Sequence, residues 1–380
     1  MKEENNSFLT PEFIKIAFYK FTLLKFIVFI FILFFNIKLF IMIKRKNNNQ
    51  NISVNEIINQ INSVRNISNI LFNYTSILKY DKFDENINKL YIYLQNKFCE
   101  KENESIIQEY ENKITKVYAN FSGKIFDLFV YKNNDYISNL IKEYHNWEEE
   151  HTNKILKALE YYTKKKQIEN KDIYLLDIGS NIGWYTYSLG KYGYNILSFE
   201  ASKINNFIMY KNYCLNKDVK VTIIDKGLDI DDKICSLKTD SNNQGNGIIL
   251  CENRDKKLYE YNGDLFKNIE LTKLNRYIRY LSNKNLAVIK IDVEGAEANV
   301  IGGGKKLISK YHVPFITIEY EIRLLESHGT KVLEFLQFLE NNGYKFSLND
   351  FLSKQYISIF NLRKNFNLFN LFITHEKFIE

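Results

Sequence analysis

A glycine-containing turn between two apolar strands is the feature that most constrains how this chain folds. It lies in the run YLLDIGSNIGWYTYSLGKYGYNILSFEAS, residues 174–202. Tyr174 to Leu176 form one short apolar segment and Asn195 to Phe199 form another, and both are typical of buried strands. A helix is expected from about Trp184, so the run predicts a strand, a turn, a helix and a strand in succession. The turn holds three residues that can bring backbone N–H groups to a ligand: Gly179, Asn181 and Gly183.

Acidic residues end both strands. Asp177 directly follows the first strand, and Glu200 directly follows the second. In folds of this kind ligands bind beside the carboxyl ends of the strands, where an acid can accept hydrogen bonds from ribose hydroxyls. Glu200 is therefore predicted to bind a nucleoside, and Asp177 to bind the charged end of the same ligand, directly or through water.

The glycine spacing discriminates between nucleoside cofactors. Gly179 and Gly183 are separated by three residues, so the G-x-G-x-x-G pattern of dinucleotide-binding folds is absent. S-adenosylmethionine fits better, because its sulfonium and amino acid end need a turn lined with N–H and C=O groups. The predicted S-adenosylmethionine site comprises Asp177, Gly179, Asn181, Gly183 and Glu200.

A second motif, IKIDVEGAE at residues 289–297, places an acidic turn after a buried strand. Together with DIGSNIGWY and FEAS, it resembles the FkbM-type family of S-adenosylmethionine-dependent methyltransferases, which pairs a D-x-G-x-N-x-G turn with a K-x-D-V-E-G-x-E turn. The resemblance covers residues 172–380 and implies an O-methyltransferase with a Rossmann-like class I methyltransferase sheet. One departure is Asn275 in LTKLNRYI, where such proteins tend to carry an aspartate.

Asp292 and Glu294 are the candidate catalytic residues. A hydroxyl that receives a methyl group must lose its proton, and a positioned carboxylate can accept it. Asp292 is the first choice because it ends the buried strand, and Glu294 is the second. Glu297 is better explained as an acid at the positive end of a helix. Lys290 is expected to pair with one of these acids, either to keep it ionised or as a structural salt bridge.

The predicted fold is a doubly wound α/β sheet within a methyltransferase domain at residues 151–380. Cofactor and acceptor should meet above the carboxyl ends of its first, second and fourth strands. The segment 225–261, with a turn at NNQGNG, either folds over the acceptor or forms a surface hairpin. The expected strands are residues 174–176, 195–199, 219–224, 286–291 and 315–318, followed by an antiparallel edge pair near 344–348 and 369–374.

The front of the chain differs in composition. After a tail at residues 1–20, residues 21–43 are nearly all Phe, Ile, Leu and Val, which predicts a transmembrane anchor. No small residues follow as a cleavage site, which argues against a signal peptide, while a buried core helix remains an alternative. Residues 44–150 contain a single glycine, Gly123, and apolar residues at helical spacing, so they are expected to form a helical stem.

Charges and sequons bear on membrane orientation. The basic residues on either side of residues 21–43 are nearly balanced and tilt slightly towards a cytosolic domain. N-x-S/T sequons favour the lumenal side, because they occur in the stem and none begins within residues 154–380. The prediction is a single-pass type II protein of the Golgi or endoplasmic reticulum with a lumenal catalytic domain. The stem sequons begin at Asn51, Asn66, Asn73, Asn103 and Asn120.

Metal and nucleic-acid signals are weak. The cysteines form no C-x-x-C pair and the histidines no H-x-x-x-H pair, so no metal is predicted, and a disulfide is neither excluded nor assigned. The formal charge of +7 is accompanied by no nucleic-acid-binding motif, so no nucleic-acid partner is expected. No pattern addresses the oligomeric state.

The acceptor is expected to be a small-molecule, glycan or glycolipid hydroxyl, because the FkbM-type family is best known for methylating such groups. Two other classes of function stay open. The glycine spacing disfavours an NAD-dependent sugar-modifying enzyme. The intact acidic and glycine positions disfavour a membrane-anchored binding module that has lost turnover.

Overall fold

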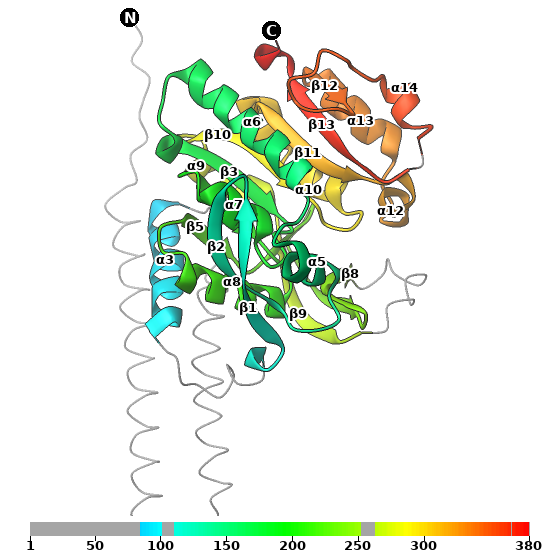
Figure 1. Cartoon of the computed structure of the whole chain (residues 1–380). Helices are drawn as coiled ribbons and strands as arrows, with labels where there is room; N and C mark the ends of the chain where they lie inside the picture. The colour runs from blue at the N-terminus through cyan, green and yellow to red at the C-terminus, as the bar shows by residue number, and fades with distance from the viewer. Residues whose placement is uncertain (1–83, 101–109, 252–262, 366, 380) are drawn as a thin grey trace, which may run out of the picture. The chain divides into compact units, whose positions relative to one another are not determined.

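A seven-stranded sheet forms the centre of the described part of the chain. The computed structural model describes residues 84–100, 110–251, 263–365 and 367–379, which all fall in one compact unit, Asp81–Glu380 (Figure 1). The strand order is β12-β13-β11-β10-β3-β4-β5, and only the pairings of β13 are antiparallel. In chain order the strands are β3 (Ile173–Ile178), β4 (Asn195–Phe199), β5 (Lys220–Ile224), β10 (Asn285–Ile291), β11 (Phe315–Tyr320), β12 (Tyr344–Ser347) and β13 (Phe369–His375).

The structure confirms the predicted doubly wound sheet. All seven predicted strands are present, and β12 and β13 are antiparallel neighbours as expected. The apolar runs form strands because both faces of the sheet are covered, and in β10 every residue after Asn285 is buried. The chain lays down β3, β4 and β5 in one direction and β10 and β11 in the other, so a topological switch point lies between β3 and β10. Ligands of open α/β sheets bind at such points.

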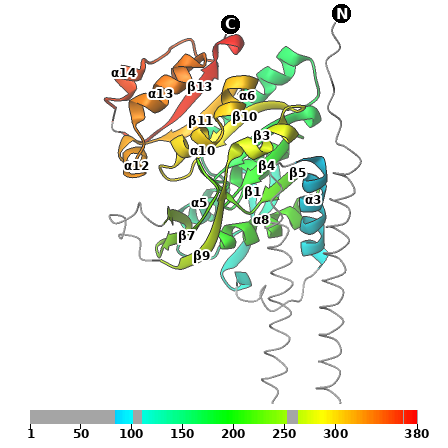
Figure 2. The same ribbon diagram turned by 180° about the vertical axis from the view of Figure 1, so that it is seen from behind.

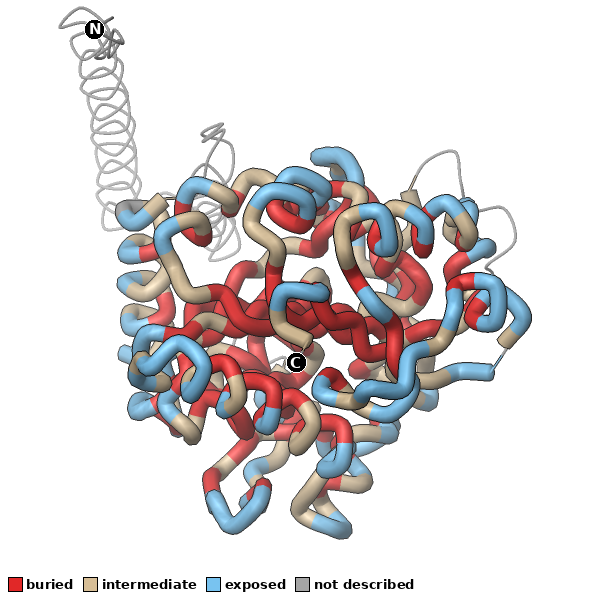
Figure 3. The backbone as a smooth tube through the Cα atoms, turned by 90° about the horizontal axis from the view of Figure 1, so that it is seen from above, coloured by how far each residue is buried: buried red, intermediate tan, exposed pale blue. Residues whose placement is uncertain are grey.

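Helices cover the sheet on both sides, as Figures 1 and 2 show. In Figure 3 the buried backbone runs through the middle of the unit and the exposed backbone lies outside it. One hydrophobic cluster packs α6 (Glu149–Lys166), α7 (Trp184–Gly190) and α8 (Lys203–Leu215) against the sheet. The other packs α9 (Ile278–Leu281), α10 (Glu297–Gly303), α11 (Lys305–Tyr311), α12 (Ile322–Ser327), α13 (Val332–Asn341) and α14 (Ile359–Leu362).

Helix α3 (Glu85–Glu100) covers the edge of the sheet. It is helical, as its apolar spacing predicted, but it packs beside β5. The side-chain amide of Gln95 donates to the carbonyl of Val221 at 3.1 Å and accepts from the N–H of Ile223 at 2.9 Å. These bonds satisfy edge groups of β5 that would otherwise be open to another strand. A disulfide between Cys99 and Cys214 joins α3 to α8.

A β-hairpin follows α3, where a helical stem was predicted. Strands β1 (Ile114–Phe121) and β2 (Lys124–Tyr131) pair antiparallel, and α5 (Tyr136–Tyr144) follows them. Ser122 and Gly123 close the hairpin with φ values of 48° and 82°, as a two-residue hairpin turn requires. The compact unit therefore begins well before residue 151, the predicted domain boundary, because the hairpin packs its apolar face on the helices beside the sheet.

A smaller four-stranded sheet has the order β6-β9-β7-β8. Its strands are β6 (Gly227–Leu228), β7 (Lys233–Asp240), β8 (Asn243–Leu250) and β9 (Leu265–Thr272). Strands β7 and β8 form a hairpin, which was one of the two alternatives for residues 225–261. The turn of that hairpin is shorter than the NNQGNG run, because residues 243–247 belong to β8. A second disulfide, Cys235–Cys251, ties β7 to the residue after β8.

The membrane prediction needs correction. The predicted tail, anchor at residues 21–43 and first part of the stem lie outside the described residues. Among the residues that the structure does describe, no helix combines the length and apolar character needed to cross a membrane. This finding contradicts the predicted localisation as a single-pass type II protein of the Golgi or endoplasmic reticulum, and that localisation is not retained.

Candidate cofactor and acceptor site

A cavity of about 240 Å³ opens beside the switch point of the sheet. It brings together residues from the turn after β3, the end of β4, the turn after β10, the end of β11 and strand β8. Five of the seven predicted site residues line it: Gly179, Asn181, Glu200, Asp292 and Glu294. The other two, Asp177 and Gly183, do not line it. The roles of all seven in binding and catalysis stay predictions.

The turn after β3 is built from left-handed backbone. Gly179, Asn181 and Gly183 have φ values of 72°, 51° and 94°. The N–H groups of Gly179 and Ser180 both donate to the carbonyl of Phe199 at the end of β4, at 3.0 and 3.1 Å. These bonds hold the turn against β4 and leave its outer side facing the cavity. Such a turn can present backbone groups to a charged ligand.

The two glycines of the turn have different surroundings. A Cβ atom on Gly179 would lie 1.7 Å from the carbonyl oxygen of Asp292, so this glycine permits contact with the end of β10. A Cβ atom on Gly183 would lie 2.4 Å from the sulfur of Met209 and 2.6 Å from the ring of Tyr187. Gly183 therefore packs against α7 and α8, and its requirement for glycine comes from this packing as well as from its φ of 94°.

Glu200 fastens the turn from the end of β4. The carboxylate is buried, with Oε2 accepting from the N–H of Asn181 and Oε1 from the N–H of Ser202, both at 2.7 Å. Burial raises the pKa of Glu200 to about 7, although the N–H groups of Ser202 and Asn181 act in the opposite direction. A carboxylate has about four lone-pair sites, so acceptor capacity remains for ribose hydroxyls.

Asp177 lies beneath the turn. Its Oδ2 accepts a hydrogen bond from Thr186 Oγ1 at 2.6 Å, and its Oδ1 lies 3.7 Å from Lys290 Nζ without a hydrogen-bond partner among the described residues. Burial raises the pKa of Asp177 in spite of the attraction of Lys290. The aspartate is completely buried, so in this conformation it supports the site from below.

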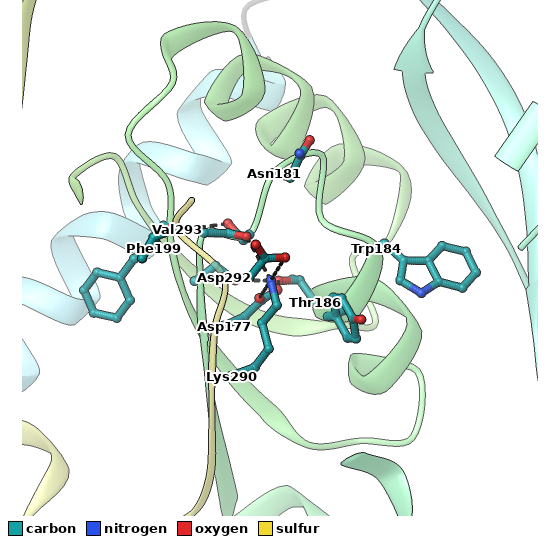
Figure 4. A network of polar contacts seen from close by, with 12 residues as sticks. Asp177, Asn181, Trp184, Thr186, Phe199, Lys290, Asp292 and Val293 are labelled. Atoms are coloured by element: carbon teal, nitrogen blue, oxygen red, sulfur yellow. Dashed lines mark hydrogen bonds and ion pairs between the residues drawn. The ribbon is translucent and has the colours of Figure 1, made fainter. Parts of the chain in front are cut away.

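Lys290 links the two motifs. In Figure 4 its side chain rises from β10 between Asp177 and Asp292. Its ammonium donates to the carbonyl of Gly179 at 3.1 Å and lies 3.3 Å from Asp292 Oδ2. Burial lowers the pKa of Lys290, but the charges of Asp292, Asp177 and Glu148 outweigh it and raise the pKa to about 12. The predicted pairing of Lys290 with an acid of the second motif is thus present.

Three carboxylates converge at the acceptor side of the cavity. Oxygens of Asp292, Glu294 and Glu319 all lie within 4.8 Å of one another. Burial, reinforced by Asp292 and Glu297, raises the pKa of Glu294 to about 8. Burial, reinforced by Asp292 and Glu294, raises the pKa of Glu319 to about 9. Three oxygens so placed could coordinate a hard divalent cation, and the sequence-based expectation of no metal stays a prediction.

Glu297 and Asn275 have structural positions. Oε1 of Glu297 accepts from the N–H groups of Val293 and Gly295 at 3.0 and 3.3 Å, inside the turn that precedes α10. This arrangement agrees with the interpretation of Glu297 as an acid at a helix start. Asn275 accepts from the N–H of Leu307 at 3.3 Å and joins the segment before α9 to α11.

Sequence reasoning missed Glu148 and Glu319. Glu148 precedes α6 with φ of 40°, lines the cavity and accepts a hydrogen bond from the hydroxyl of Tyr185. Burial raises the pKa of Glu148, but hydrogen bonds from His151 and Tyr185 outweigh it, so the net shift is downward. In the sequence Glu148 is one of three successive glutamates at a helix start, which hides it. Glu319 could have been found, because it is an acid near the end of a buried strand, as Asp292 is.

Comparison with known proteins bears on the class of this domain. Residues 177–346 match the family model described as the methyltransferase FkbM domain, which confirms the resemblance seen in the sequence. The comparison with curated proteins found no match. The chain carries a methyltransferase domain.

Three solved structures that the chain matches are distant from it. A crystal structure of WbdD has 9% identity and a TM-score of 0.38, covering 71% of this chain and 47% of its own. The Pyrococcus abyssi tRNA (uracil-54, C5)-methyltransferase in complex with S-adenosyl-L-homocysteine has 9% identity and a TM-score of 0.31, covering 69% and 44%. Precorrin-6y C5,15-methyltransferase from Geobacter metallireducens has 10% identity and a TM-score of 0.29, covering 60% and 90%. The chain thus spans about half the length of WbdD.

Proposed function

We propose, from the methyltransferase FkbM domain at residues 177–346 as the premise, that this protein transfers a methyl group from S-adenosylmethionine to a hydroxyl oxygen. The acceptor in this proposal is a sugar or another small polyhydroxylated molecule. The observation that carries the proposal is the single cavity that joins the turn after β3, Glu200 and the carboxylate of Asp292.

The cofactor half of the cavity fits a nucleoside with a charged tail. Glu200 stands at the end of β4 with acceptor capacity for two hydroxyls, and Gly179 and Asn181 border the same space. The backbone of Gly179 lies against the carbonyl oxygen of Asp292, which brings the turn next to the acceptor carboxylates. A bound cofactor's reactive end would therefore lie close to Asp292. The absence of a G-x-G-x-x-G turn favours S-adenosylmethionine over a dinucleotide.

The acceptor half suits hydroxyl groups. Glu294, Glu319 and Asn246 line it and offer carboxyl and amide groups that can both donate and accept hydrogen bonds. With pKa values of about 8 and 9, Glu294 and Glu319 keep their protons at neutral pH and can donate to acceptor oxygens. A polyhydroxylated acceptor offers the complementary oxygens.

Asp292 is the group best placed to take the proton. Its side chain is 38% exposed, lies in the cavity and has the ammonium of Lys290 3.3 Å away. S-adenosylmethionine, when bound, supplies an activated methyl group on sulfur. While the acceptor oxygen takes up that methyl group, the carboxylate of Asp292 would take the hydroxyl proton. Orientation of the two reactants in one cavity provides the larger part of the rate enhancement. The carboxylate contributes a further factor of about 10² to 10⁴ in rate.

Transfer of a labelled methyl group tests the proposal. The full chain would be incubated with trideuteromethyl S-adenosylmethionine and a panel of monosaccharides, methyl glycosides and polyols, followed by mass spectrometry. Labelled O-methyl products that depend on Asp292 are expected. Label found only on nitrogen or carbon atoms, or on no compound while the cofactor binds, would overturn the hydroxyl acceptor.

A further inference from the structure

The backbone of Gly245, in strand β8, makes hydrogen bonds through both its N–H and its carbonyl. Its N–H donates to Asp135 Oδ1 at 2.8 Å. Its carbonyl accepts from Asn205 Nδ2 at 2.9 Å and from Asn181 Nδ2 at 3.2 Å. These partners come from three separate segments: the residue that caps α5, the first turn of α8, and the cofactor turn after β3. One residue of the β7–β8 hairpin is thus bonded to all three segments.

The bonds around Gly245 close into a ring. From Asn205 the ring continues to Tyr131, whose hydroxyl donates to Asn205 Oδ1 at 2.7 Å. The N–H of Tyr131 donates to Ser138 Oγ at 3.0 Å, and the N–H of Ser138 donates to Asp135 Oδ2 at 2.8 Å. Every residue of this ring is buried. Removing one donor or acceptor therefore leaves a buried polar group without a partner, which is costly.

Asn181 is the connection between the ring and the cofactor turn. Its side chain bonds to Gly245 and to the N–H of Ile182, while its own N–H bonds to Glu200 at 2.7 Å. Asn181 holds a φ of 51°, which is uncommon for a residue other than glycine and needs support from its surroundings. The carbonyl of Gly245 provides that support from across the cavity.

Gly245 has no room for a side chain. A Cβ atom there would lie 2.5 Å from Asp135 Oδ1 and 3.0 Å from Asn181 Oδ1. An alanine at this position would force Asp135 Oδ1, which accepts the N–H of Gly245, to shift. The requirement for glycine arises first at Asp135 and second at Asn181 of the cofactor turn, although Gly245 is far from both residues in sequence.

We propose that the backbone of Gly245 positions the cofactor turn through Asn181, so that the β7–β8 hairpin is part of the S-adenosylmethionine site. Gly245 and Asn205 are positioning residues, because they act on the cofactor through Asn181 and Glu200. The proposal deepens the proposed function and rests on it for the identity of the ligand. Residues 225–261 were expected either to form a surface hairpin or to fold over the acceptor. In this proposal they contribute a hairpin that is hydrogen-bonded to the cofactor turn.

Calorimetric titration of the full chain with S-adenosylhomocysteine tests the proposal. Asn205→Ala should weaken binding at least about tenfold, because Gly245 and Tyr131 each lose a buried partner. Asn242→Ala is the matched control, since Asn242 is exposed at the tip of the same hairpin, and its affinity should stay within about twofold of wild type. Equal affinities for wild type and Asn205→Ala, both folded by thermal melting, would overturn the proposal.

A double-mutant cycle tests the route through Asn181. Gly245→Ala should weaken S-adenosylhomocysteine binding at least about tenfold in the wild-type background and less than about threefold in the Asn181→Ala background, since residues that act together are not additive. Full additivity of the two losses would show that Gly245 acts by another route and would overturn the proposed mechanism.

Amide hydrogen exchange of the free protein gives a readout that needs no ligand. Gly245→Ala and Asn205→Ala should speed exchange in residues 179–184, while residues 286–291 of β10 keep wild-type protection. If the wild-type chain binds no S-adenosylhomocysteine, the proposed function fails but the exchange result still decides the positioning role. Unchanged protection of residues 179–184 in both variants would overturn that role.

Discussion

The backbone of Gly179 touches the backbone of Asp292: a Cβ atom on Gly179 would lie 1.7 Å from the Asp292 carbonyl oxygen. The turn expected to bind the cofactor and the residue expected to take the acceptor proton are therefore in direct contact. The N–H of Asp292 also donates to the carbonyl of Ile178 at 3.0 Å, just before the turn. Any displacement of the turn must move Asp292 as well, so binding and catalysis should fail together when this contact is disturbed.

Gly179→Ala should abolish this contact. The variant is expected to lose at least about tenfold in S-adenosylhomocysteine affinity and to melt at a lower temperature, because backbone must move away from backbone. Gly193→Ala is the matched control, since Gly193 has φ of 88° but its Cβ would meet nothing closer than Asn170 Cβ at 3.8 Å. That control should cost only the left-handed backbone strain of about 1–2 kcal/mol in free energy of unfolding. Similar losses of affinity in both variants would contradict the importance of the contact with Asp292.

Cofactor binding should depend on pH through Glu200. Because burial raises the pKa of Glu200 to about 7, its carboxylate gains negative charge as the pH rises through that value. Ionised carboxylates accept hydrogen bonds more strongly, so affinity for S-adenosylhomocysteine should increase from about pH 6 to about pH 8. Glu200→Gln should weaken binding about tenfold at the higher pH and flatten the dependence, as calorimetry at several pH values would show. A wild-type pH dependence that survives in Glu200→Gln would assign it to another group.

Asp292→Asn should separate binding from turnover. Methyl transfer measured with labelled S-adenosylmethionine should fall at least about a hundredfold, because the carboxylate no longer takes the proton. Affinity for S-adenosylhomocysteine should stay nearly unchanged, because Lys290 keeps the Gly179 carbonyl and Asp177 as partners. Glu294→Gln provides the comparison, because the pKa of Glu294 is raised to about 8 and the group therefore mostly holds a proton at neutral pH instead of accepting one. Full turnover in Asp292→Asn with loss in Glu294→Gln would move the role to Glu294.

Stability should fall as the pH rises because of Glu319. Its pKa is raised to about 9 in the folded chain, whereas an unfolded glutamate titrates near about 4.3, so the folded state binds more protons between these values. The stabilisation is fully present below about pH 4.3 and is lost as the pH rises through about 9. Glu319→Gln should remove part of this decline in thermal melts between about pH 5 and 9. The exposed Glu340 provides the control, and Glu340→Gln should keep the wild-type slope. Parallel slopes for wild type and Glu319→Gln would show that Glu319 does not hold its proton.

The central sheet could be predicted because its strands are local features. Strand β4 was predicted with its observed ends, and the helix α7 begins at Trp184 as expected, since apolar runs and turn residues determine both. The hairpin β1–β2 was missed, although Ser122 and Gly123 between alternating apolar residues are a hairpin signal. The scarcity of glycine before residue 179 points away from a compact α/β domain in that region and so conceals the hairpin.

Only the site residues at the ends of the central strands could be predicted from the sequence. Strand ends meet at one edge of a parallel sheet, so Glu200 and Asp292 could be placed together from sequence. The contacts of Glu148 and Gly245 depend on segments distant in the chain, and no local pattern reports which partners they meet. The disulfides Cys99–Cys214 and Cys235–Cys251 were likewise beyond reach, because pairing follows from tertiary proximity.

The most direct test of the account is a calorimetric titration of the purified full chain with S-adenosylmethionine and, separately, with NAD. The account predicts saturable binding of S-adenosylmethionine to one site, binding at least about tenfold weaker in Gly179→Ala, and no binding of NAD at the same concentrations. Binding of NAD without binding of S-adenosylmethionine would contradict the cofactor assignment and the proposed methyl transfer with it.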